Sequence, residues 1–332
     1  MKTVKVKLAF SAAIILAALS GAAHGEAWSD KSPHKELSLR ANGVRLNFLD
    51  WGGQGSAILF LPGLGDTAHV YDELAPRFTN HFHVLALTRR GSGKSEKPEA
   101  GYDTETLVED VSQFLDGLKL KKVILVGHSI AGNELTRFAG LHPERVLKMV
   151  YLDAAYDRSG LMEILAKSPP EPQPTPTDTE SVESYVKWSH KLHPIWSEAC
   201  EASLRDGFVT PNPNVVTWAS SASHVSLSLL RGAVHFHPDY KMVEAPVLAF
   251  FAFDDHAFER WESRMPGANE AARQQARLFQ QLWREEQLRQ IDRFQKEMKK
   301  GRVIKMPDTI HLCFIQRQSE IVRLMDEFLA EK

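Results

Sequence analysis

The stretch VILVGHSIAGNEL, residues 123–135, decides the fold. Four apolar residues end at Gly127, Ser129 follows two places later, and a segment with helical spacing of apolar residues comes after it. This order is typical of a buried strand, a tight turn and a helix. From the stretch alone, Ser129 is either a nucleophile raised on a sharp turn or a polar residue where a strand meets a helix. A nucleophilic serine also needs a base, an orienting acid and an oxyanion site elsewhere in the chain.

The rest of the chain alternates short apolar runs with amphipathic segments. The apolar runs lack strict alternation with polar residues, which is typical of strands covered on both faces in a parallel sheet flanked by helices. The fold class that we predict is therefore α/β. Strands are predicted at 36–40, 44–50, 56–61, 82–88, 122–127, 146–152, 246–252 and 302–306, and helices at 68–79, 104–118, 130–141 and 316–330.

Two segments interrupt this alternation. Residues 168–180, SPPEPQPTPTDTE, are too rich in proline for a helix or a sheet, and they lie within a stretch of roughly 90 residues between two consecutive predicted strands. We therefore predict a core made of residues 26–154 and 246–332, interrupted by an inserted subdomain at 155–245. The spacing of apolar residues over 268–299 predicts a long amphipathic helix whose apolar stripe is a packing face.

The first 25 residues have a composition of their own. Three lysines within the first seven residues precede an uncharged apolar run at 8–19, and small residues follow up to Gly25. These are the three parts of a secretory signal peptide, and the apolar run is short for a membrane span of roughly 20 residues. We expect cleavage of residues 1–25 and a periplasmic or secreted mature chain that begins near Glu26.

The overall composition limits the partners. The chain has 332 residues, of which 43% are apolar and 25% charged, and its net charge is −2. This balance gives no reason to expect nucleic acid or an anionic membrane as a partner, and it leaves a small-molecule substrate. The two cysteines, Cys200 and Cys313, can pair after export or remain free buried thiols. No CxxC or Cys/His spacing typical of a zinc site is present.

Three further stretches supply partners for Ser129. AILFLPGLGD, residues 57–66, is a strand that ends in a glycine-containing turn, which can direct a backbone N–H at a developing oxyanion. PVLAFFAFDDH, residues 246–256, is a strand that ends in paired acids, and MPDTIHLCF, residues 306–314, contains a strand, a short loop and His311. The order serine, acid, histidine, each after a strand, is the order that a hydrolase sheet uses.

On these residues the chain resembles the α/β-hydrolase superfamily, from about residue 36 to the C-terminus apart from the insertion and the long helix. The superfamily's G-x-S-x-G has Ala131 in its last position here, and its D-R-G-x-G-x-S is replaced by TRRGSGKS at 88–95. The superfamily usually has His-Gly at the oxyanion turn, and this chain has Pro62-Gly63 there. The change is tolerable because the donors are backbone N–H groups and not side chains. The resemblance implies a mostly parallel sheet, a helical cap formed by the insertion, and no metal or organic cofactor.

The sequence therefore predicts an exported serine hydrolase that cleaves a small carboxylic ester through an acyl-enzyme. Ser129 is the predicted nucleophile, His311 the general base and then acid, and Asp255 the orienting acid. The backbone N–H groups of Leu64 and Ile130 are the predicted oxyanion donors. A peptidase of the proline-iminopeptidase type and a ligand-binding protein with little turnover are the alternatives.

The choice of acid and base leaves three residues to be tested. Asp254 is the neighbour of Asp255, and Asp153 follows another strand, at a position that supplies the acid in some hydrolases. His128 is adjacent to Ser129, but we expect its side chain to point away from the serine side chain on a sharp turn.

Overall fold

The computed structural model describes residues 28–193, 195–208 and 220–331, so the predicted signal peptide lies outside the described residues. Within them one sheet of eight strands has the order β1-β2-β4-β3-β5-β6-β7-β8. β2 pairs antiparallel with β1 and β4, and every other neighbouring pair is parallel. The strands are β1 (Lys35–Ala41), β2 (Val44–Gly52), β3 (Ala57–Leu61), β4 (His83–Leu87), β5 (Val123–His128), β6 (Val146–Leu152), β7 (Val247–Phe253) and β8 (Gly301–Pro307).

The predicted fold class is confirmed. Each predicted strand forms, with ends displaced by two residues at most. β3, β5 and β7 are buried along their whole length, as expected for strands with helices on both faces. Because β3, β5, β6, β7 and β8 run in parallel, the loops that follow them meet at one edge of the sheet.

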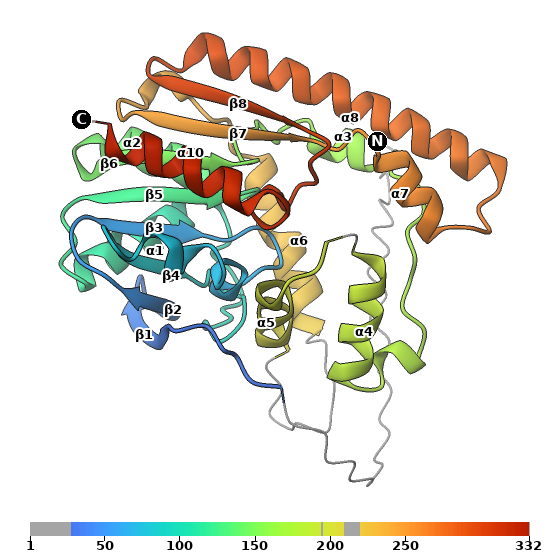
Figure 1. Cartoon of the computed structure of the whole chain (residues 1–332), viewed down its shortest axis with the longest axis horizontal. Coiled ribbons are helices and arrows are strands. Elements are labelled where there is room, and N and C mark those ends of the chain that lie inside the picture. The colour runs from blue at the N-terminus through green and yellow to red at the C-terminus, as the bar shows by residue number, and fades with distance from the viewer. Residues whose placement is uncertain (1–27, 194, 209–219, 332) are drawn as a thin grey trace, which may run out of the picture.

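Two groups of helices cover the two faces of the sheet (Figure 1). One face packs against α1 (Thr104–Gly117), α2 (Ala131–Leu141) and the C-terminal half of α8 (Glu270–Glu297). The other packs against the short helices η1 (Ala68–Tyr71) and η2 (Ala75–Phe78), α9 (Cys313–Gln316) and α10 (Gln318–Ala330). Each face thereby acquires its own hydrophobic core.

The helix predicted at 68–79 is replaced by η1 and η2, two short 3₁₀ turns. Pro76 lies in the first turn of η2. A proline within an α-helix lacks the N–H donor and collides with the carbonyl four residues earlier, so a continuous helix through this position is unfavourable. The chain instead turns twice, and η1 directly follows the turn at the end of β3.

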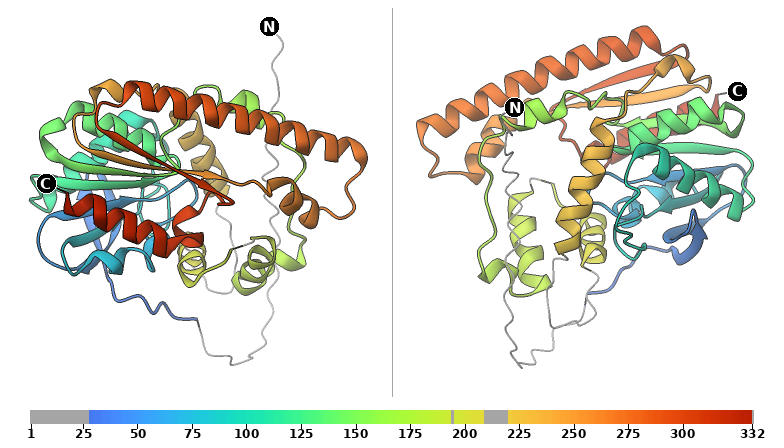
Figure 2. Two further views of the ribbon diagram at one scale, coloured as in Figure 1. Left: turned by 45° about the horizontal axis from the view of Figure 1, so that its top comes forward. Right: turned by 180° about the vertical axis from the view of Figure 1, so that it is seen from behind.

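The segment between β6 and β7 is the long excursion that the sequence predicts. It contains α3 (Leu161–Leu165), η4 (Thr177–Thr179), α4 (Val182–Leu192), α5 (Glu198–Gly207), α6 (Ser220–Val234) and η5 (Tyr240–Met242). α5 packs against η1, and α6 places Leu229 and Ala233 against Ile130, the residue after Ser129. Figures 1 and 2 show α4, α5 and α6 gathered beside one end of the sheet.

The predicted long helix is α8, and only part of its apolar stripe is a packing face. Within the stripe, Ala276, Ile291 and Phe294 are buried, whereas Trp283 is exposed. In Figures 1 and 2 the first part of α8 extends past the sheet beside α7 (Ala257–Arg264). No helix in the described part of the chain is both long and apolar enough to cross a membrane.

Candidate active site

Ser129 lies in the turn that joins β5 to α2, as the opening stretch predicts. Its φ of 54° is in the left-handed region, which a residue with a side chain adopts at a cost. Strain of this kind persists where the surrounding structure enforces it, and it concentrates at functional sites. The Ser129 N–H donates to the Leu152 carbonyl at 3.3 Å, which ties the turn to the end of β6.

Small residues allow this turn to approach the neighbouring chain. A Cβ atom on Gly132 would lie 1.9 Å from the Ala154 carbonyl oxygen, so only glycine fits there. A Cβ on Gly127 would lie 2.7 Å from the Leu135 Cδ1 and 3.1 Å from the Ala131 Cβ, so a side chain there would push against α2. Gly132 therefore supplies the close approach for which the common G-x-S-x-G pattern uses its last glycine.

His311 pairs with Asp153. The His311 Nδ1 lies 2.6 Å from the Asp153 Oδ2, and the Asp153 side chain is almost fully buried whereas His311 is half exposed. The other carboxylate oxygen of Asp153 accepts the Ala252 N–H at 3.0 Å and the Tyr156 hydroxyl at 2.5 Å. Three donors thus hold the Asp153 carboxylate in a fixed orientation behind the imidazole.

The prediction that Asp255 orients His311 is wrong. The carboxylate of Asp255 accepts a hydrogen bond from Arg284 and another from the Asp308 N–H at 3.0 Å. These two donors hold the pKa of Asp255 below its ordinary value. The alternative Asp254 is bound by Arg260. Asp153 is the acid that reaches His311, because it directly follows β6 with a φ of 49° and the N–H of Ala252 on β7 fixes its carboxylate.

Two residues that the sequence analysis did not single out support the Asp153 carboxylate. Burial and the adjacent Asp153 carboxylate raise the pKa of Tyr156 well above its ordinary range, so its hydroxyl remains a donor. Gln287 of α8 lies 3.3 Å from the Tyr156 hydroxyl and donates to the Ala252 carbonyl at 2.9 Å. The buried half of the long helix thereby supports the acid.

Two buried arginines bind the carbonyls of the two peptide groups whose N–H groups are the predicted oxyanion donors. Arg89 donates to the Pro62 carbonyl at 2.9 Å and to the Gly63 carbonyl at 3.2 Å. Arg158 donates to the Ser129 carbonyl at 2.5 Å. Because C=O and N–H point in opposite directions across a trans peptide, the N–H groups of Leu64 and Ile130 point away from these arginines. Among the described residues neither N–H has an acceptor within the protein.

His128 bridges the turn of Ser129 and the loop of His311. Its Nε2 donates to the His311 carbonyl at 3.1 Å, and the centroids of the His128 and His311 rings lie 4.5 Å apart. Burial and the nearby His311 lower the pKa of His128 well below its ordinary value, so the ring stays neutral. Its buried Nδ1 has no donor among the described residues.

Asp66 is a carboxylate at this site that the sequence analysis passed over. It follows the predicted oxyanion turn, and its Oδ2 lies 3.9 Å from the His128 Nδ1. Burial raises the pKa of Asp66 from 3.8 to about 6, against the opposing influence of His311 and Arg89. The sequence signal that could have indicated Asp66 is its place in the turn GLGD, four residues after Pro62.

The elements meet at the edge of the sheet where the parallel strands end. This edge holds a serine in a strained strand–turn–helix and a histidine paired with a buried acid, an arrangement that hydrolases with this sheet use. The model of the alpha/beta hydrolase fold family matches residues 56–259. The chain belongs to this family, and it is a hydrolase of the alpha/beta fold.

Two of the relatives are named for hydrolysis or deformylation of small compounds. The chain is 27% identical over 198 residues to 2-(acetamidomethylene)succinate hydrolase of Mesorhizobium japonicum, a match that covers 59% of this chain and 70% of that one. It is 29% identical over 133 residues to N-formylmaleamate deformylase of Pseudomonas putida, covering 40% of this chain and half of that one. The solved structure of an E-2-(acetamidomethylene)succinate hydrolase, 20% identical, superposes with a TM-score of 0.66 over 90% of this chain and all of that chain.

Proposed function

We propose that the protein is a serine hydrolase that cleaves small acyl compounds through an acyl-enzyme, with Ser129, His311 and Asp153 as its triad. The observation that carries the proposal is the hydrogen bond between His311 and buried Asp153 at the sheet edge that also holds strained Ser129. A binding protein of the same fold needs neither the strained serine nor the paired imidazole.

The reaction follows from these groups. The Ser129 hydroxyl attacks the acyl carbon while its proton passes to the Nε2 of His311, and Asp153 stabilises the resulting imidazolium. The imidazolium then gives that proton to the leaving alcohol or amine as the bond to the acyl carbon breaks. Water attacks the acyl-enzyme in the same way, with its proton passing to His311 and then to the departing Ser129 oxygen.

The two arginine-held peptides supply the oxyanion site. In both tetrahedral intermediates the former carbonyl oxygen carries negative charge, and the N–H groups of Leu64 and Ile130 donate to it. Arg89 and Arg158 bind the carbonyls of the same two peptide groups, which fixes the N–H directions before substrate arrives. A hydrogen bond to a peptide carbonyl also polarises its N–H, so the arginines strengthen these donors.

A small carboxylic ester is the substrate class that we propose first. Both named relatives act on compounds whose names contain an N-acyl group, and this observation supports small amides as a second candidate. The segment between β6 and β7 is the proposed cap, because α6 packs against Ile130 beside the nucleophile and α5 packs against η1 beside the oxyanion turn. Its side chains would then select the substrate.

We also propose that the chain is exported and that residues 1–25 are removed. The support is the sequence of these residues, with a basic start, a short apolar run and small residues at the end. Mass spectrometry of the protein from the periplasm and culture medium of its source would locate the new N-terminus near Glu26. Recovery of the full-length chain in the cytoplasm would contradict export.

Covalent labelling tests the proposed nucleophile. A fluorophosphonate probe reacts with an activated serine, so it should label the wild type and fail to label Ser129→Ala. Ser319→Ala is the matched control, because Ser319 is exposed on α10 and lies away from the proposed chemistry. Labelling that survives in Ser129→Ala, or its absence from folded wild type, would refute the mechanism.

A hydrolysis screen tests the substrate class. p-Nitrophenyl esters of increasing chain length, N-acyl amides and lactones should be compared by kcat/KM with the same enzyme preparation. We expect turnover of short acyl esters that disappears in Ser129→Ala. A folded protein that takes up the probe but prefers the amides would retain the nucleophile and replace the ester by the second candidate.

A further inference from the structure

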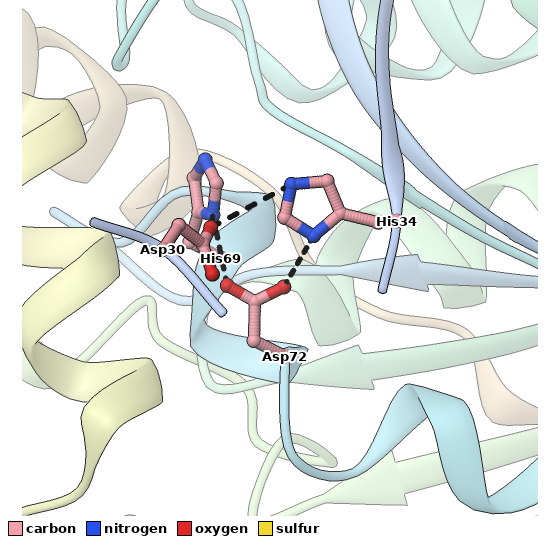
Figure 3. Close-up of side chains that lie close together, drawn as sticks. All are labelled: Asp30, His34, His69 and Asp72. Atoms are coloured by element: carbon pink, nitrogen blue, oxygen red, sulfur yellow. Dashed lines mark hydrogen bonds and ion pairs between the residues drawn. The ribbon is translucent and has the colours of Figure 1, made fainter. Parts of the chain in front are cut away.

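Four side chains outside the hydrolase site converge beside η1. Asp30 and His34 come from the segment before β1, and His69 and Asp72 come from η1 and the residue after it (Figure 3). Each offers one potential ligand atom, and these four atoms all lie within 4.8 Å of one another. His34, His69 and Asp72 are more than nine-tenths buried at the side chain, and Asp30 is about three-quarters buried.

One carboxylate lies between the two imidazoles. The Asp72 Oδ1 lies 2.9 Å from the His34 Nδ1, and its Oδ2 lies 2.8 Å from the His69 Nδ1. Two buried imidazoles that share one carboxylate are a common arrangement around a metal ion, but they also form without one. The fourth residue, Asp30, adds a second carboxylate that faces both imidazoles.

Asp30 presents a free acceptor to this cluster. Its Oδ1 accepts the Ser32 N–H at 2.8 Å, which fixes the carboxylate. Its Oδ2 is buried, lies 3.0 Å from the His69 Nδ1 and 3.6 Å from the His34 Nε2, and has no hydrogen-bond donor of acceptable geometry among the described residues. A buried carboxylate oxygen of this kind is unfavourable unless a cation lies beside it, and that cation is either an imidazolium of His34 or His69 or a bound metal ion.

The distances suit a tetrahedral ion. Zinc binds His nitrogen and carboxylate oxygen at roughly 2.0–2.2 Å, which places neighbouring ligand atoms about 3.4 Å apart. With one ligand atom taken from each of the four residues, the atoms all lie within 4.8 Å of one another, so small side-chain shifts would bring them to that spacing. Two imidazoles and two carboxylates suit zinc and neighbouring first-row metals, whereas Ca²⁺ and Mg²⁺ prefer six or more oxygen ligands.

We propose that Asp30, His34, His69 and Asp72 bind one divalent transition-metal ion of the zinc type as a structural site. The ion takes a ring nitrogen from each histidine, and each ligating imidazole carries its remaining proton on the other nitrogen. An imidazolium releases one proton to solvent on binding, whereas a neutral imidazole changes tautomer only. Four protein ligands leave no open position for substrate, which is the pattern of a structural site.

The site connects the N-terminal segment to η1, which directly follows the oxyanion turn. Ser32 already donates to the Asp72 carbonyl at 3.2 Å and accepts from the Trp51 indole at 3.0 Å. His69 lies five residues after Leu64, and the Thr67 N–H between them donates to the Ser203 hydroxyl of α5 at 3.0 Å. The ion would thus stiffen the point where the N-terminal segment, the oxyanion turn and the excursion meet.

Metal binding by purified protein that retains Asp30 tests the proposal. After removal of metal with a chelator, Zn²⁺ and Co²⁺ should each bind at one ion per chain, and Co²⁺ should give the intense visible absorption of tetrahedral coordination. Binding of Zn²⁺ should raise the melting temperature, and Ca²⁺ or Mg²⁺ should not. A wild type that binds neither Zn²⁺ nor Co²⁺ would refute the site without any need for variants.

Substitutions locate the ion. His34→Ala and His69→Ala should each weaken Co²⁺ binding at least about tenfold and abolish the Zn²⁺-dependent rise in melting temperature. His83→Ala is the matched control, because His83 pairs with Asp50 at 3.0 Å in a cluster of only two groups. The proposal is overturned if His83→Ala loses binding as fully as His34→Ala, or if both cluster variants bind as tightly as wild type. A variant that fails to fold is replaced by His34→Gln, with the same outcomes.

Discussion

The Nδ1 of His311 lies 2.6 Å from the Oδ2 of Asp153, so the acid at the end of β6 reaches the histidine at the end of β8 across the end of β7. The β7 backbone takes part in this contact, because the Ala252 N–H holds the other oxygen of the same carboxylate. The acids that follow β7, Asp254 and Asp255, face Arg260 and Arg284 instead. The position of the acid therefore depends on which carboxylate is buried behind the imidazole.

Asp153→Asn should lower kcat/KM by roughly a thousandfold or more. The amide keeps the size of the carboxylate but cannot stabilise an imidazolium. With its oxygen accepting from the Tyr156 hydroxyl and the Ala252 N–H, it presents its NH2 group to the His311 Nδ1 and so favours the wrong tautomer. The measurement is ester hydrolysis, with the rate of fluorophosphonate labelling as a second readout and circular dichroism as a check of folding.

Asp255→Asn is the control for that experiment. Asp255 is exposed and bound to Arg284, so its replacement should leave kcat/KM within about threefold of wild type. If Asp255→Asn loses more activity than Asp153→Asn, the geometry around His311 does not describe the working enzyme and the acid that the sequence predicts is reinstated.

The strands and most helices could be predicted because their signals are local. An apolar run of five to eight residues between polar segments is typical of a strand that is buried on both faces, and Gly127 at the end of one such run indicates a turn. The acid could not be chosen by the same means. Asp153 and Asp255 each follow an apolar strand, and only the packing of Tyr156 and Ala252 around one of them decides which is buried.

Arg158→Met should lower kcat about 10- to 100-fold with little change in KM. The substitution removes the donor to the Ser129 carbonyl and so loosens the peptide whose N–H, that of Ile130, faces the oxyanion. Steady-state kinetics on a p-nitrophenyl ester separates the two constants, because a general loss of folded enzyme would lower the apparent kcat only in proportion to the folded fraction.

Arg145→Met is the matched arginine variant. Arg145 also donates to a backbone carbonyl, that of Leu120 at 3.1 Å, but far along the chain from the turn of Ser129. It should lower stability without changing kcat per folded molecule. Equal losses of kcat in the two variants would show that Arg158 has no special role in positioning the oxyanion donor.

The contacts beyond the triad depend on residues that are distant in sequence. Arg89 lies in TRRGSGKS, and nothing in that segment indicates that its side chain reaches the carbonyl of Gly63, 26 residues earlier. The four-residue cluster beside η1 has a weak local signal, an Asp and a His four apart and a His and an Asp three apart. Only the fold brings these two pairs together, so spacing alone did not predict a metal site.

Gly132→Ala should destabilise the protein by about 1–3 kcal/mol and lower activity. The new Cβ would lie 1.9 Å from the Ala154 carbonyl oxygen, so the backbone next to Asp153 must move. Gly140→Ala in the same helix is the control, because its Cβ would lie 3.3 Å from the Cβ of Met242 and alanine favours helix by up to about 1 kcal/mol. Urea unfolding and kcat/KM check both variants. Equal stability of the two would mean that the turn tolerates a side chain at 132.

Asp66→Asn should change how stability depends on pH. Burial raises the pKa of Asp66 to about 6 in the folded protein, whereas an unfolded aspartate ionises near 3.8. The folded state therefore binds this proton more tightly than the unfolded chain does. The extra unfolding free energy of wild type is fully present below about pH 4 and is lost as the pH rises to about 6. The full difference in pKa corresponds to at most about 3 kcal/mol, and solvent at this partly exposed side chain reduces it.

The asparagine side chain does not titrate, so the unfolding free energy of wild type minus that of Asp66→Asn should fall between about pH 4 and pH 6 and stay level above it. Urea unfolding at intervals from about pH 4 to pH 8 measures this difference. Asp255→Asn serves as the opposite case, because the pKa of Asp255 is lowered in the folded protein. The unfolding free energy of wild type minus that of Asp255→Asn should therefore rise as the pH increases through the acid range. A difference for Asp66→Asn that is independent of pH would show that its carboxyl ionises as freely in the folded protein as in the unfolded chain. The carboxylate would then stand in solvent, away from His128 and the oxyanion turn.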